Sequence, residues 1–94
     1  MSVSLKEIIF QRYNQFLNEI APIIETSLFP DINDVDIVDL LALVEIFFPS
    51  GQRTEISLRN VITMKSLEVD DEKLALITPI LDKFLKFIEK IKTL

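Results

Sequence analysis

The chain has 94 residues, the length of one domain, and a formal net charge of −5. Ile, Leu, Val and Phe supply 40 of its residues, whereas there are only three Ala and one Gly, so the apolar half consists almost entirely of bulky side chains. A chain of this length buries only about 60–65% of the surface that its extended form exposes. One small core cannot hide so many large apolar side chains, and we expect some of them to be buried against another chain.

The chain contains no His and no Cys. This excludes Ser-His-Asp and Cys-His nucleophiles, ordinary zinc sites, redox thiols and disulfides. The acidic segment 31–36 resembles a calcium loop only in its oxygen content, because it lacks the Gly and Glu that an EF-hand needs at its sixth and twelfth positions. Asp36 and Asp39 lie three residues apart, and we interpret them as first-turn charges that oppose a helix dipole rather than as an acid–base pair. The sequence therefore predicts a non-enzymatic protein with no metal, no cofactor and no small-molecule substrate.

The charge is unevenly distributed along the chain. No basic residue lies between Arg12 and Arg53, and this stretch holds seven acidic residues: Glu19, Glu25, Asp31, Asp34, Asp36, Asp39 and Glu45. The predicted acidic partner surface consists of four of them: Asp31, Asp34, Asp36 and Asp39. An acidic protein is repelled by phosphate backbones, so direct binding of nucleic acid is not expected.

No segment reaches the roughly 18 uninterrupted apolar residues of a membrane span. The N-terminus has no basic region followed by an apolar core, which a secretory signal would require. The sequence therefore favours a cytoplasmic protein that does not bind membranes.

The first predicted helix begins at Ser4–Glu7, which has the spacing of a capping box. Apolar residues then recur at helical intervals over 5–24. Pro22 removes a backbone donor, so the helix either ends near Ile20 or kinks. We favour a kink, with the helix continuing to about Leu28.

The second predicted helix covers about 35–48 and is capped by Asn33 or Asp34. Eleven of these fourteen residues are apolar, and they occupy every side of the helical wheel. A helix that is apolar all round is buried all round. We therefore expect this helix at the centre of the fold or of an assembly, where Asp in place of Leu41 or Leu43 would prevent folding.

The segment 54–67 is open to two interpretations. Thr54 is a suitable helix cap, but Thr54, Ile56 and Leu58 also alternate as in a strand. We favour a helix, because a single short hairpin is not stable without a sheet and nothing else in the chain supplies strands.

The last predicted helix covers about 71–93 and is capped by Asp70 or Asp71. It carries a heptad seam of large apolar residues: Leu74, Ile77, Leu81, Phe84, Ile88 and Ile91. Pro79 kinks this helix or divides it in two. Four apolar residues lie outside the seam and form the predicted interface: Leu76, Ile80, Leu85 and Phe87.

The same helix carries a basic strip of Lys83, Lys86 and Lys90. We interpret this strip mainly as a face exposed to solvent. The alternative is that it pairs with the acidic 19–45 region, within one chain or across two.

Together these features predict one all-α domain, 1–94, built as a compact bundle of four or five helices with the 35–48 helix at its centre. The predicted function is a non-enzymatic interaction or scaffold domain that self-associates, with a twofold homodimer as the commonest form. The alternative is an acidic regulator that binds a basic surface of another macromolecule, as inhibitors and antitoxins do.

Overall fold

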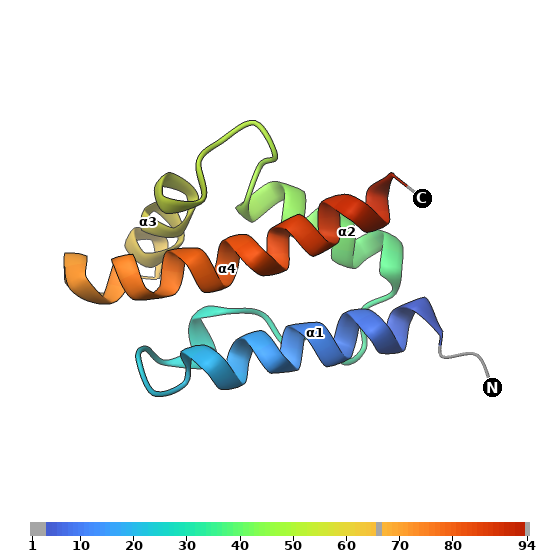
Figure 1. Ribbon diagram of the computed structural model, residues 1–94, viewed down its shortest axis with the longest axis horizontal. Helices are drawn as coiled ribbons and strands as arrows, with labels where there is room; N and C mark the ends of the chain where they lie inside the picture. The colour runs from blue at the N-terminus through green and yellow to red at the C-terminus, as the bar shows by residue number, and fades with distance from the viewer. Residues whose placement is uncertain (1–3, 66, 94) are drawn as a thin grey trace.

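All regular structure in the computed structural model, which describes residues 4–65 and 67–93, is helical (Figure 1). The α-helices in these ranges are α1 (Leu5–Ile20), α2 (Ile37–Phe47), α3 (Thr54–Met64) and α4 (Asp71–Lys92), and a short 3-10 helix, η1 (Thr26–Leu28), lies between α1 and α2. The described residues contain no strand, which confirms the all-helical fold. The helical interpretation of the segment 54–67 is confirmed for Thr54–Met64, whereas Leu67 lies beyond the helix and residue 66 lies outside the described residues. The chain is compact, with a radius of gyration of 13.2 Å.

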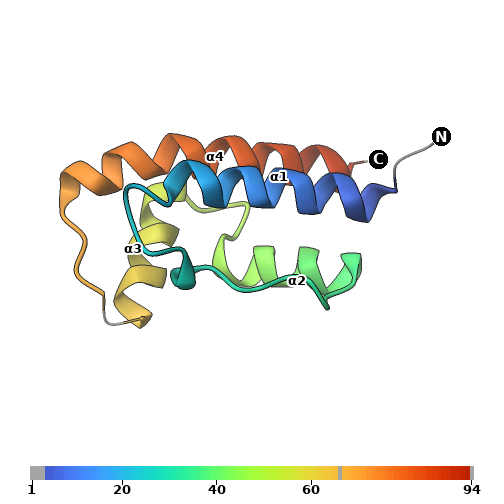
Figure 2. The same ribbon diagram turned by 90° about the horizontal axis from the view of Figure 1, so that it is seen from below.

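The helices form two layers. α1 and α4 run side by side in opposite directions, and α2, α3 and η1 lie together on one face of that pair (Figure 2). The closest helix contacts join α4 to α1 and to α3. The predicted seam of α4 is buried in full: Leu74, Ile77, Leu81, Phe84, Ile88 and Ile91. α4 is therefore the central helix of the fold.

The prediction that α2 occupies the centre is wrong for the single chain. Of its eleven residues only Leu40 is buried, while Val38 is 76% exposed and Ile46 is 70% exposed. The physical reason is that α2 has the α1–α4 layer on one side and no layer on the other. Leu41 and Leu43 are only half-buried. The expectation that Asp at either position prevents folding assumed full burial, and it no longer follows.

The kinked extension of the first helix is also wrong. α1 ends at Ile20, and the chain then turns, with the N–H groups of Ile23 and Ile24 both donating to the Ile20 carbonyl at 2.8 and 3.0 Å. Pro22 has no N–H to continue the helical ladder, and this accounts for the end of α1 at that point. Leu28 belongs to η1 instead.

Three helices begin with side-chain caps. Ser4, Asp36 and Asp70 each accept a hydrogen bond from the backbone N–H three residues later, at 3.2, 2.8 and 2.8 Å. This confirms Ser4 and selects Asp70 over Asp71. The second helix begins later than predicted because Asp36, rather than Asn33 or Asp34, is its cap.

α4 is one continuous helix through Pro79. Beside the proline, the Thr78 hydroxyl donates to the Leu74 carbonyl at 2.7 Å. Pro79 therefore does not divide the helix, and a kink there stays a prediction.

Aromatic side chains fill the core between the layers. The rings of Phe16 and Phe84 stack at 5.7 Å, and Phe29 meets Phe16 edge-on at 4.9 Å. The Tyr13 hydroxyl donates to the carbonyl of Pro30. These contacts attach the segment after η1 to the α1–α4 layer.

Candidate interaction surfaces

Within 4–65 and 67–93, no group of three or more His, Cys, Asp or Glu side chains is placed to hold a metal ion. No helix in the same ranges is long and apolar enough to cross a membrane. The predicted site residues all belong to surfaces, the acidic one and the apolar one on α4.

The four predicted acidic residues are all exposed. Asp36 caps α2, and Asp31 accepts a hydrogen bond from the Asn33 N–H at 3.0 Å. Asp34 and Asp39 accept no side-chain hydrogen bond among the described residues. None of the four takes part in the ion pairs of the described residues. Two of these carboxylates therefore stabilise local structure, and two carry charge alone.

The four predicted interface residues do not share one face of α4. At about 100° per residue, Leu76, Ile80 and Phe87 fall within about 40° of one another, whereas Leu85 lies on the other side of the helix. Ile80 and Phe87 border α1, and Leu85 faces α2. Leu76 is 54% exposed, and the other three are half-buried. The structure thus brings three of the residues together and separates the fourth.

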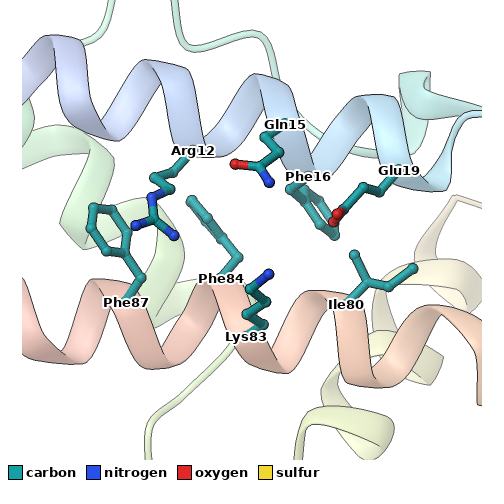
Figure 3. Close-up of a pocket in the computed structure, with 8 residues that line it drawn as sticks. All are labelled: Arg12, Gln15, Phe16, Glu19, Ile80, Lys83, Phe84 and Phe87. Carbon is teal, nitrogen blue, oxygen red and sulfur yellow. The ribbon is translucent and has the colours of Figure 1, made fainter.

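A shallow groove runs between α1 and α4 on the face that looks away from α2 and α3 (Figure 3). We call it the α1/α4 groove, and it is lined by Arg12, Gln15, Phe16, Glu19, Ile80, Lys83, Phe84 and Phe87. The Arg12 guanidinium lies over the Phe87 ring, 4.9 Å from its centroid. The enclosed volume is only about 20 Å³, which is room for about one water. The groove therefore suits a protein surface better than a small molecule.

A second apolar surface lies on the outside of α2. Val38, Ala42 and Ile46 follow one another at intervals of four residues, which places them in one line along the helix, and all three are exposed. We call this line the α2 outer stripe. The charged residues within α2 are Asp39 and Glu45, which flank the stripe and are both acidic. The outside of α2 is thus apolar along its middle and has one carboxylate along each edge.

The inner side of α2 covers a small apolar cavity of about 30 Å³. Its wall contains no charged side chain: Tyr13, Phe16, Phe29, Pro30, Ile32, Leu40, Leu43, Val44, Phe47, Phe48, Leu81, Phe84 and Leu85. A cavity of this size has no room for a cofactor. The inner side of α2 thus faces the α1–α4 layer, and the outer stripe lies on the opposite side of the helix.

Glu45 links α2 to the end of α4. One of its carboxylate oxygens accepts a hydrogen bond from the Lys92 ammonium at 2.8 Å, and the other accepts from the backbone N–H and the hydroxyl of Ser50 at 3.3 Å. The bond from Lys92 is the main cause that holds the pKa of Glu45 below its ordinary value, followed by the bond from the Ser50 N–H. The Lys92–Glu45 pair therefore adds a charged link between α2 and the end of α4 to the apolar packing of the inner side of α2.

Two open hollows, of about 460 and 590 Å³, flank the segment 67–69. One is bordered by the turn after α1, and the other by Arg59 and Ile62 of α3. Each combines apolar and charged side chains, and neither holds a metal-binding cluster among the described residues.

The sequence interpretation missed the α2 outer stripe, because it placed all of α2 in the core. The signal was nevertheless present: Asp39 and Glu45 mark the side of the helix that faces water, and Val38 and Ile46 lie between them on the helical wheel.

In comparisons with protein-family models, curated proteins and solved structures, no match to the chain was found.

Proposed function

We propose that the chain is a non-enzymatic interaction domain that self-associates through exposed apolar helical surface. The α2 outer stripe carries this proposal. Nine of the eleven residues of α2 are apolar, yet only one is buried. Each large side chain left in water forgoes about 1.5–3 kcal/mol of burial free energy. Val38 and Ile46 are therefore the natural contacts for a second protein surface.

A second copy of the chain is the partner we propose. Most oligomers of small proteins are assembled from identical chains, and a twofold dimer is their commonest form. Leu76, at 54% exposed, adds a further large apolar side chain on a separate surface of the same chain. A chain with two such surfaces has more than one way to bind its own copies.

The test is the molar mass of the purified protein in solution, measured by light scattering from micromolar to millimolar concentration. We expect a mass above that of one chain, increasing with concentration. The double variant Val38→Lys, Ile46→Lys should remain helical and lose most of this association. A matched control, Asn14→Lys with Asn60→Lys, adds the same charge at exposed positions of α1 and α3 and should associate like the wild type. A wild-type protein that is monomeric throughout contradicts self-association.

The acidic regulator is the second candidate, and one observation favours it: the four exposed Asp residues form no ion pair among the described residues. In that case the wild type stays monomeric and binds a basic amphipathic helical peptide in calorimetric titration. Asp34→Asn with Asp39→Asn should weaken that binding. These two residues are chosen because Asp31 and Asp36 also stabilise local structure.

A further inference from the structure

The α2 outer stripe and the α1/α4 groove carry charges of opposite sign. Two carboxylates flank the stripe within α2. Glu45 is paired with Lys92 at 2.8 Å, whereas Asp39 forms no ion pair among the described residues, so the stripe is negative on balance through Asp39. The groove holds two cations, Arg12 and Lys83, and one carboxylate, Glu19, so it is positive on balance. Each of the two surfaces has apolar side chains at its middle.

The two surfaces lie on opposite sides of the molecule. α2 packs beneath the α1–α4 layer, and its stripe is on the side away from that layer (Figure 2). The groove opens on the other side of the layer, away from α2 (Figure 3). One copy of the chain therefore cannot bring its own stripe and groove together.

A twofold pairing of either surface with itself gains less from its charges than the pairing of one surface with the other. Stripe against stripe brings together two surfaces that are negative on balance, and groove against groove brings together two that are positive on balance. Stripe against groove places unlike charges side by side and sets Val38 and Ile46 against Ile80 and Phe87, the half-buried apolar residues of the groove.

From this arrangement we infer that copies of the chain associate head to tail, the α2 outer stripe of one copy docking on the α1/α4 groove of the next. The inference rests on the proposed self-association and adds its geometry. An interface between two different surfaces does not end at a dimer: each added copy leaves one stripe and one groove open, so assembly continues until a ring closes or a filament forms.

The experiment uses two variants, each with one damaged surface. Val38→Lys with Ile46→Lys damages the stripe and leaves the groove intact. Lys83→Glu reverses the charge of a residue that lines the groove, and Leu76→Glu adds a carboxylate about one helical turn before Ile80, on the same side of α4. Both positions are exposed, and the stripe stays intact. Each variant alone should be monomeric. An equimolar mixture should form a one-to-one complex, because one intact stripe then meets one intact groove.

In that complex one substituted stripe and one substituted groove remain open, with opposite charges. They should not bind further copies, since exposed ion pairs without apolar contact contribute only about 0–1 kcal/mol. The wild type should show a mass that increases with concentration without a plateau at two chains, and added salt should lower it. If a double variant loses its helical spectrum, Ile46→Lys and Lys83→Glu are used singly in the same mixing experiment.

The outcomes separate this inference from the proposed function. A monomeric wild type overturns both. An oligomeric wild type whose two variants are monomeric alone but do not bind each other overturns the head-to-tail geometry and leaves self-association standing. A stable plateau at two chains, insensitive to salt, also overturns it and identifies a twofold dimer.

Discussion

Tyr13 illustrates how a single residue joins two parts of this fold. Its ring is buried against Phe16 and Phe84, and its hydroxyl donates to the Pro30 carbonyl. Burial raises the pKa of Tyr13 far above its ordinary value, and the charge of Asp31 raises it further. The hydroxyl is therefore protonated, and able to donate this hydrogen bond, at neutral pH.

Replacing Tyr13 with Phe should lower the free energy of unfolding by about 1–3 kcal/mol, because the Pro30 carbonyl then loses its donor in a partly buried place. Urea denaturation of the two proteins measures the difference. The helical spectrum should not change, since the ring is retained. Equal midpoints for the two proteins would mean that water replaces the hydroxyl at that carbonyl.

At the scale of the helix, α2 and α4 differ most. α4 buries six residues and contacts both α1 and α3, whereas α2 buries one. Local opening is easiest where few apolar contacts have to be broken. The amide hydrogens of α2 should therefore exchange with solvent faster than those at the middle of α4, which hydrogen exchange read by NMR will show. If the chain self-associates as proposed, exchange of the α2 amides should slow when the protein concentration is raised. Equally slow exchange in α2 and α4 at low concentration would contradict this account.

The position of Pro79 permits a second test at this scale. Pro79 is exposed and lies inside a continuous helix, where proline is about 3 kcal/mol less favourable than Ala. Pro79→Ala restores an N–H that can donate to the carbonyl four residues earlier. We expect a higher melting temperature, with a gain of at most about 3 kcal/mol. A lower melting temperature would instead show that α4 needs the shape that proline imposes in order to pack against its neighbours.

For the whole molecule, sequence periodicity predicted the elements better than their arrangement. The α4 seam was identified correctly, because only one side of that helix carries such a line of large apolar residues. α2 has apolar residues on every side, so several packings satisfy its pattern, and the pattern alone does not show which side faces the core. The α2 outer stripe becomes visible only once the α1–α4 layer is placed beneath Leu40 and its inner neighbours. Leu85 and Phe87 were grouped by proximity in sequence, although the helix directs them to different neighbours.

Two hydrogen bonds to carboxylates join the layer of α2 and α3 to α4. Lys92 donates to Glu45 of α2, and the Thr54 hydroxyl of α3 donates to Asp82 at 2.9 Å. The bond from Thr54, followed by that from Lys86, holds the pKa of Asp82 below its ordinary value of 3.8, and the bond from Lys92 does the same for Glu45, whose ordinary value is 4.5. Both carboxylates are thus more acidic in the folded chain than in the unfolded one.

This difference fixes the direction of the pH dependence. A carboxylate whose pKa is lower in the folded state stabilises the fold above its unfolded pKa, and that stability is lost as the pH falls through the folded pKa. The melting temperature should therefore decrease as the pH is lowered below the ordinary values of Glu45 and Asp82, 4.5 and 3.8. Glu45→Gln should melt at a lower temperature than the wild type at neutral pH, and the two curves should converge in strong acid, where the wild-type carboxylate is protonated. Thermal unfolding followed by circular dichroism across this range provides the comparison; a gap that stays constant down to strong acid would show that Glu45 holds α2 in place by something other than its charge.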